Sequence, residues 1–147
     1  MSAPPALAQE EMVAFLQREF PHAGFRDGRL RLAAYGRGTC RVLMPLDERS
    51  IRPGPSVSGP AMMGLGDISA WIALLSVIGP VPLAVTATLN ATFLRPAGLS
   101  DLACDCSVLR AGRRIAAMLA AVSRLEDGQA VAHMTITYAI PDRAPRG

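Results

Sequence analysis

Residues 58–80 form the run SGPAMMGLGDISAWIALLSVIGP, which contains a single charged side chain. Ser58 is a preferred N-cap residue, and Pro60 stands in the first turn, where the N–H that proline lacks would have no helical partner. Gly79-Pro80 is a typical stop signal. The run predicts one helix over about 59–77, apolar on nearly every side, as expected of a helix buried inside a fold.

The same helix is long enough to be a transmembrane candidate. Asp67 lies near its middle and would cost about 2.5 to 3.5 kcal/mol on insertion scales. Gly64, Gly66 and Ser69 dilute its apolarity, and strand-like segments flank it on both sides. We therefore expect the core helix of a globular protein that has no membrane partner.

Apolar and polar residues alternate with period two on both sides of this helix. Before it, residues 29–35 and 39–44 flank Gly36-Arg37-Gly38 and predict an antiparallel hairpin. After it, short turns separate four further predicted strands, at 83–94, 102–110, 115–125 and 130–140. Successive hairpins favour an antiparallel sheet, whose apolar face needs the one long helix for cover. The expected fold is α+β, an antiparallel six-stranded sheet wrapped round the helix.

The strand at 83–94 alternates strictly. Its apolar residues share one face, and Thr86, Thr88 and Asn90 share the other. A strand with a polar second face is either half exposed or turned toward a second subunit.

The remaining segments divide the chain. Residues 7–20 have the apolar spacing of an amphipathic surface helix, and residues 47–57 are rich in Pro, Gly and Ser, as a loop is. We predict an N-terminal helix and lead-in at 1–24, the main domain at 25–141 and a C-terminal tail at 142–147.

The composition predicts one ordered domain. Half of the 147 residues are hydrophobic and only 18% are charged, which argues against disorder. All 15 basic residues are Arg, scattered along the chain, and aromatic residues make up 5%, so a nucleic-acid surface is not expected.

Neither export nor a metal site is expected. The first 22 residues carry charges in a helical pattern and lack the apolar core of a signal peptide. Cys40, Cys104 and Cys106 form no CxxC pair, which argues against a disulfide framework and against zinc. The simplest setting is the cytoplasm.

Asp67 is the first candidate for chemistry, because an unpaired carboxylate is costly to bury in so apolar a helix. Met63, Gly64 and Trp71 lie one turn away on its face. The indole would exclude water and the glycine leaves room for close approach, which favours a base beside a narrow slot. The alternative is a structural Asp paired with an Arg or with backbone groups.

The helix start is the second candidate. The free N–H groups at Ser58 and Gly59 could hold an anion or a developing oxyanion, and glycine permits close approach. Small residues are common at helix starts, so this feature alone is weak.

Two motifs carry a family resemblance: SGPAMMGLGD at 58–67 and LNATFLRPA at 89–97. Together they resemble the hot-dog-fold acyl-CoA thioesterases of the phenylacetate-degradation (PaaI-like) type, whose pattern is His-Gly-Gly, Leu-Ala-Asp and then Phe-Leu-Arg-Pro-Ala. The resemblance covers roughly residues 25–141 and implies the hot-dog fold.

The resemblance implies that Asp67 acts as general base or nucleophile on the thioester, and that the Gly59 amide polarises its carbonyl. Ser58 stands where the family has His, and Pro60 where it has the second Gly. Because proline has no N–H, the oxyanion would depend on Gly59 or Ala61. Ser58 could retain one hydrogen bond.

The resemblance also implies a homodimer, often paired into a homotetramer, with active sites lined by both chains. Coenzyme A enters as part of the substrate, and no further cofactor is expected. Asn90 could serve the interface or the site. Candidates for the CoA phosphates are Arg95, Arg110, Arg113 and Arg114, because guanidinium groups suit phosphate. Met62, Met63 and Trp71 would shape the acyl pocket, although each is also ordinary core.

Three functions fit these residues. The first is an acyl-CoA thioesterase, the second a non-catalytic acyl-CoA binding dimer, and the third a hot-dog dehydratase or hydratase. The third pairs a His with the carboxylate, and neither His22 nor His133 is near the helix. The sequence does not identify the acyl group, nor does it decide whether the thioester is one of CoA or of acyl-carrier protein.

Overall fold

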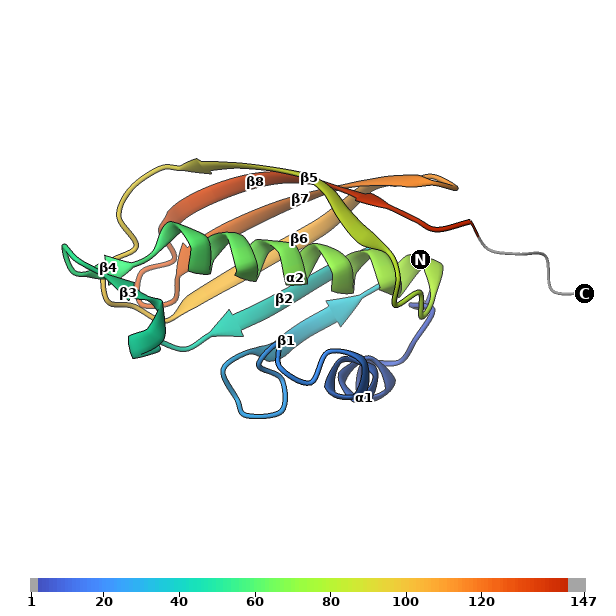
Figure 1. Cartoon of the computed structure of the whole chain (residues 1–147), viewed down its shortest axis with the longest axis horizontal. Coiled ribbons are helices and arrows are strands. Elements are labelled where there is room, and N and C mark those ends of the chain that lie inside the picture. Colours follow the sequence, from blue (N-terminus) through green and yellow to red (C-terminus); the bar gives the residue numbers. More distant parts are fainter. Residues whose placement is uncertain (1–2, 143–147) are drawn as a thin grey trace, which may run out of the picture.

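The computed structural model describes residues 3–142 and contains every helix and strand expected from the sequence (Figure 1). In chain order the elements are α1 (Gln9–Glu19), β1 (Arg31–Gly36), β2 (Thr39–Met44), the 3-10 turn η1 (Glu48–Ser50), β3 (Ile51–Arg52), β4 (Ser56–Val57), α2 (Gly59–Ile78), β5 (Val85–Phe93), β6 (Leu102–Ala111), β7 (Ile115–Arg124) and β8 (Ala130–Ala139). The segment expected to be a loop, 47–57, holds η1 and the two-residue strands β3 and β4.

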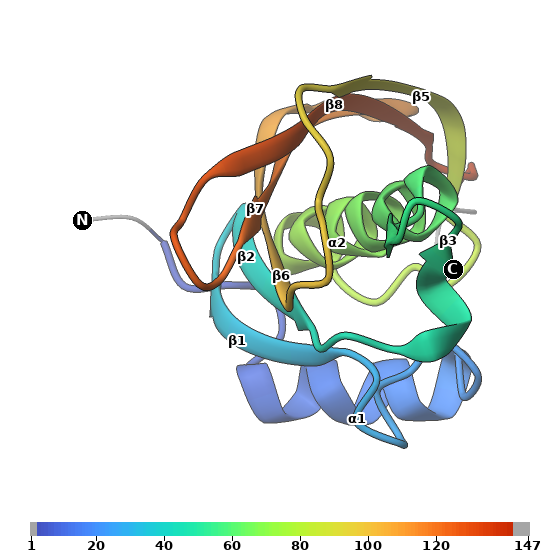
Figure 2. The ribbon, with the colours of Figure 1, turned by 90° about the vertical axis from the view of Figure 1, so that its left-hand side faces the viewer.

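The main sheet has six antiparallel strands in the order β1-β2-β6-β7-β8-β5. Viewed along the helix axis, the sheet curves around α2, and α1 lies on the far side of β1 (Figure 2). The expected α+β hot-dog architecture is confirmed. β5 follows α2 in sequence but pairs with β8, so that it forms one free edge of the sheet.

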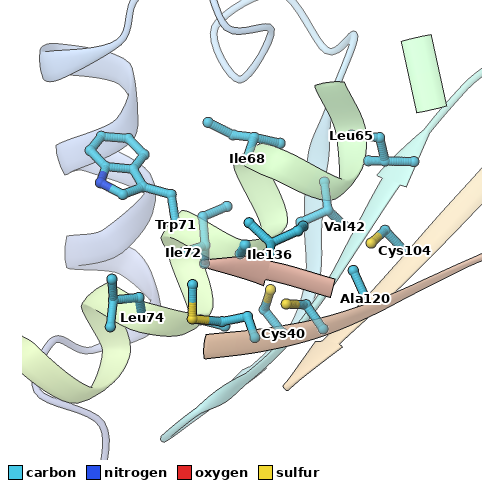
Figure 3. Packing of buried hydrophobic residues seen from close by; sticks show 14 of the residues in the cluster. Cys40, Val42, Leu65, Ile68, Trp71, Ile72, Leu74, Cys104, Ala120 and Ile136 are labelled. Carbon is cyan, nitrogen blue, oxygen red and sulfur yellow. The ribbon is translucent and has the colours of Figure 1, made fainter. Parts of the chain in front are cut away.

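Local signals set the limits of α2. Ser58 Oγ accepts a hydrogen bond from the Ala61 N–H at 3.2 Å, and Gly79 ends the helix with φ 88° and an N–H that donates to Leu75 O. Of its membrane-length apolar window, 67% is buried inside the fold. Side chains of α2 pack against buried side chains of β2, β6, β7 and β8 (Figure 3).

Gly66 faces the sheet directly. A Cβ built on Gly66 would overlap Met134 Sδ on β8, whereas one on Gly64 would meet nothing within 4 Å. The two glycines therefore differ in role. Gly66 allows the helix to pack, and Gly64 faces open space.

A β-bulge in β5 overturns part of the expected alternation. Thr86 pairs with Tyr138 and Thr88 pairs with Thr137, so Ala87 is an extra residue between two consecutive partners on β8. The bulge turns Thr86 to the same face as Tyr138, toward α2. Thr88 and Asn90 stay on the outer face. The expectation that Thr86, Thr88 and Asn90 share a face was wrong for Thr86.

The N-terminal helix is integral to the fold. The Met12, Phe15 and Leu16 side chains of α1 are buried in the common core. The rings of Phe15 and Trp71 lie 5.6 Å apart, and the Tyr35 hydroxyl donates to Leu7 O at 2.8 Å. Within residues 3–24, the described part of the N-terminal segment, α1 thus supplies side chains to the core.

Candidate active site

The Asp67 carboxylate is held by two hydroxyl groups from the sheet. Thr86 Oγ1 donates to Asp67 Oδ1 at 2.7 Å, and the Tyr138 hydroxyl reaches the same oxygen at 2.9 Å. The Tyr138 hydroxyl also lies 3.0 Å from the main-chain oxygen of Asp67. Asp67 makes no ion pair within residues 3–142, so its partners are neutral donors rather than an arginine.

Tyr138 is 4% exposed, and the bulged start of β5 brings Thr86 alongside it. Burial raises the pKa of the Tyr138 hydroxyl, and the neighbouring Asp67 carboxylate raises it further. Tyr138 therefore stays protonated throughout the neutral range and remains a donor to Asp67.

A cavity of about 580 Å³ opens beside this carboxylate. One wall is a face of α2, which contributes Ala61, Gly64, Leu65, Asp67, Ile68 and Trp71. A second wall comes from the start of β5 and from Tyr138, including Val85 and Thr86. A third comes from the end of α1 and the loops of the N-terminal half, including Phe20, Leu30 and Asp47. The carboxylate thus faces a space large enough for part of a small-molecule substrate.

A sequence profile of the thioesterase superfamily matches residues 54–131, more than half of the chain and the part that holds Asp67 and Thr86. The chain belongs to the thioesterase superfamily. A candidate esterase from Thermoplasma acidophilum is 28% identical over 102 residues, which cover 69% of this chain and 76% of that protein.

Solved thioesterase structures share the fold. A candidate thioesterase from Silicibacter sp. TM1040 superposes with a TM-score of 0.84 at 29% identity, covering 94% of each chain. Zebrafish thioesterase superfamily member 2 superposes with a TM-score of 0.80 at 17% identity, covering 92% of this chain and 99% of that one. The phenylacetic acid degradation protein PaaI of Escherichia coli superposes with a TM-score of 0.73 at 16% identity, covering 88% of this chain and 95% of that one. The expected resemblance to PaaI-like thioesterases is confirmed.

In this thioesterase-superfamily chain, three of the residues predicted to form the site share the cavity: Asp67, Gly64 and Trp71. Met63 is half-buried and packs against the core, and it is not among the cavity-lining residues. Asn90 lies on the outer face of β5, opposite Thr135, away from Asp67.

Ser58 and Gly59 lie outside the cavity, whereas Ala61 lines it. A Cβ on Gly59 would stand 3.3 Å from the Phe93 ring, which would have to shift by a few tenths of an ångström to admit it. The Ala61 N–H is occupied by the Ser58 cap. In the part of the chain that the structure describes, the Gly59 N–H has no hydrogen-bond acceptor. Of the two amides considered for the oxyanion, only that of Gly59 is therefore available.

The four predicted phosphate-binding arginines lie at two ends of the sheet: Arg110, Arg113 and Arg114 at the β6–β7 turn, and Arg95 beyond the opposite end, after Phe93. Arg95 donates to Ala130 O, and Arg114 pairs with Asp142 at 3.3 Å. Arg110 and Arg113 are exposed and form no ion pair between residues 3 and 142. The single chain does not gather the four guanidinium groups into one site.

Sequence analysis missed two members of the site, Thr86 and Tyr138. Each occupies an ordinary position in an alternating strand, and their direct pairing across β5 and β8 is the signal that would have joined them. It also missed the wall formed by the end of α1. Among the described residues, no group of three His, Cys, Asp or Glu side chains could hold a metal ion.

Proposed function

We propose that this protein hydrolyses an acyl-CoA thioester to a free acid and CoA, with Asp67 as general base or nucleophile. The position of the Asp67 carboxylate at the cavity wall carries the proposal. Thr86 and Tyr138 both engage Oδ1, whereas no donor within residues 3–142 reaches Oδ2. Oδ2 is therefore the oxygen able to accept a proton or to attack a carbonyl.

In the general-base route, Oδ2 takes a proton from water while the water oxygen bonds to the thioester carbon. The carbonyl oxygen becomes an oxyanion, whose collapse breaks the C–S bond. The departing thiolate takes the proton from Asp67, so thioester and water give acid and thiol. In the nucleophilic route, Oδ2 itself bonds to the carbon, the thiolate leaves, and water then cleaves the mixed anhydride.

The oxyanion donor requires a second copy of the chain. Gly59 and Asp67 are separated by about 12 Å of rise along α2, at 1.5 Å per residue. An amide about 3 Å from the carbonyl oxygen, and a base about 3 Å from the carbonyl carbon or from the attacking water, would lie closer together than this rise. One chain cannot supply both, so we propose that Asp67 works with the Gly59 amide of the partner subunit.

The free edge of β5 is the proposed dimer contact. Val85 is 56% exposed and Phe93 is 45% exposed, and no strand pairs with the outer side of β5 in residues 3–142. An edge strand of this length offers backbone donors and acceptors to another strand. A homodimer through β5 would bring a second α2 close to the first, and Arg110 and Arg113 remain the candidates for the CoA phosphates.

The decisive experiment measures thiol release from a panel of acyl-CoA thioesters. The native protein is expected to turn over at least one of them, and Asp67→Asn is expected to lose at least a hundredfold in kcat while keeping its oligomeric mass. Asp105→Asn is the matched control, because Asp105 is exposed and pairs with Arg41 at 3.2 Å. An Asp67→Asn protein as fast as the native one would refute Asp67 as the reacting group.

A non-catalytic acyl-CoA binding dimer is the second candidate. Ser58 stands where the family has His, and its oxygen is already engaged by the Ala61 N–H. Saturable binding of acyl-CoA with no thiol release across the panel would favour this function over hydrolysis.

A further inference from the structure

The cavity wall is divided between the family-matched region and the rest of the chain. α2 and the start of β5 lie inside the matched region, residues 54–131. Six other lining residues precede that region in the chain: Glu19, Phe20, Arg29, Leu30, Met44 and Asp47. The matched region provides Asp67. The N-terminal segment lines the same space without touching that carboxylate, so it can shape the ligand without taking part in the reaction.

The rings of Phe20 and Trp71 are in contact, and both residues line the cavity. Trp71 lies one helical turn beyond Asp67 and is 6% exposed, and its ring stands beside α1 (Figure 3). The Phe20 ring lies edge-on to the indole at 6.2 Å and is 47% exposed. An aromatic ring left so exposed beside a cavity offers an unfilled apolar surface.

The side chains near this aromatic pair are mostly apolar. Ala23, Leu30, Ile68, Pro82 and Ala84 also line the cavity, and the charged lining groups are Glu19, Arg29, Asp47 and Asp67. Arg29 is partly neutralised, because it pairs with Asp27 at 2.8 Å. Asp47 pairs with Arg49 at 2.8 Å and Glu19 with Arg18 at 3.4 Å, so within residues 3–142 Asp67 is the one lining charge with no ion-pair partner. The rest of the space therefore favours a neutral apolar group, and Asp67 itself disfavours an anion.

We infer that Phe20 and Trp71 form the end wall of an apolar acyl subsite, and that Phe20 limits the length of the acyl tail. The inference rests on the proposed function, since it takes the cavity beside Asp67 as the place of the acyl group. One helical turn, about 6 Å, separates Asp67 from Trp71, so short tails reach the aromatic pair and longer ones collide with Phe20.

Trp71 is the single tryptophan of the chain, so its fluorescence reports directly on the cavity. Straight-chain alcohols from butanol to decanol are suitable probes, because they are neutral and do not meet repulsion from Asp67, Glu19 and Asp47. In the native protein, affinity is expected to rise about fourfold per methylene and then to level off or fall once the tail reaches Phe20.

Phe20→Ala is expected to extend the rise, so that the ratio of decanol to hexanol affinity increases at least tenfold. Phe15→Leu is the matched control. Phe15 also contacts Trp71 and lies in α1, the helix that ends just before Phe20, but it is absent from the cavity wall. The dependence of affinity on the length of the alcohol should therefore not change in Phe15→Leu. If Phe20→Ala proves unstable, Phe20→Leu is the milder variant, and it should also raise the ratio of decanol to hexanol affinity.

A Phe20→Ala protein with the native chain-length order would overturn the inference, and so would a native protein whose Trp71 emission responds to no alcohol. Neither result bears on hydrolysis, which the Asp67→Asn assay tests separately. Conversely, absence of thiol release together with length-dependent binding at Trp71 would leave the subsite in place and reject the proposed reaction.

Discussion

The hydroxyl of Tyr138 bridges two oxygens of one residue, lying 2.9 Å from Asp67 Oδ1 and 3.0 Å from the Asp67 main-chain carbonyl. The contact joins the centre of α2 to the end of β8 and fixes the rotamer of the carboxylate relative to its own helix. Thr86 completes the arrangement from β5. The carboxylate proposed to react is thus oriented by side chains from two strands, β5 and β8.

Tyr138→Phe should lower kcat about tenfold with little change in KM, because the lost hydrogen bond orients the carboxylate and does not hold substrate. Steady-state assays of thiol release measure kcat and KM for both proteins.

Thr86→Val should also lower kcat. Its effect on the logarithm of kcat should be less than additive with that of Tyr138→Phe, because both hydroxyls contact Asp67 Oδ1. Thr137→Val is the control, since the Thr137 hydroxyl bonds Thr88 at 2.6 Å on the outer face of the sheet. Unchanged kcat and KM in Tyr138→Phe would show that this contact is structural only.

The sequence predicts α2 well because its limits are local: a cap at Ser58 and a stop at Gly79-Pro80 act on adjacent residues. Strand positions are predictable for the same reason, because the alternation of apolar and polar side chains is also a pattern of adjacent residues. The β5 bulge has no comparable signature, since Thr-Ala-Thr alternates as well as any strand. The pairing of β5 with β8, and with it the meeting of Thr86, Tyr138 and Asp67, depends on contacts far apart in the chain.

The N-terminal helix shows the same limit. Its apolar spacing correctly predicts a buried face, but spacing cannot say that Phe20 would overhang the cavity that holds Asp67. Likewise, the motif places Gly59 and Asp67 in one helix, and the helix rise of about 12 Å between them is the reason for proposing that they act from different chains.

Two glycines of α2 should respond oppositely to alanine. Gly66→Ala should destabilise the fold by about 1–3 kcal/mol, because its methyl group would meet the buried Met134 side chain. Gly64→Ala should stabilise it by about 0.5–1 kcal/mol, because the new methyl meets no atom and alanine favours the helix. Urea denaturation of the two variants measures both changes, and equal destabilisation would contradict this packing.

Alkaline pH should weaken the fold through its buried thiols. Burial raises the pKa of Cys104 to about 11 and that of Cys40 well above its usual value, with Cys40 5% exposed. Because these pKa values are raised on folding, the stability they contribute is complete below pH ~8.5 and is lost as pH climbs through the folded values. Thermal unfolding at several pH values should show a falling Tm between about pH 9 and 11.

The same thiols should resist a neutral aromatic disulfide reagent at pH 8 in the native state and react fully in denaturant, because all three cysteines are buried and free. Rapid native labelling of any of them would contradict the burial on which the alkaline prediction depends.

Proline substitutions at two adjacent residues of β5, Ala91 and Thr92, should separate loss of the dimer from loss of the fold. The Leu94 N–H donates to Val131 O on β8, so by alternation the Thr92 N–H also points to β8 and the Ala91 N–H points to the open edge. Ala91→Pro removes a donor only from the free edge, which tolerates proline. It should convert the proposed dimer to monomer in sedimentation while circular dichroism and Tm stay near native.

Thr92→Pro removes a bond inside the sheet and should instead lower Tm, which makes it the matched control. Because Asp67 is proposed to use the Gly59 amide of the partner subunit, the monomeric Ala91→Pro protein should also lose most of its kcat. A monomer that hydrolyses thioesters at the native rate would show that each chain carries a complete site. The oxyanion donor would then have to be sought among groups that line the cavity of a single chain.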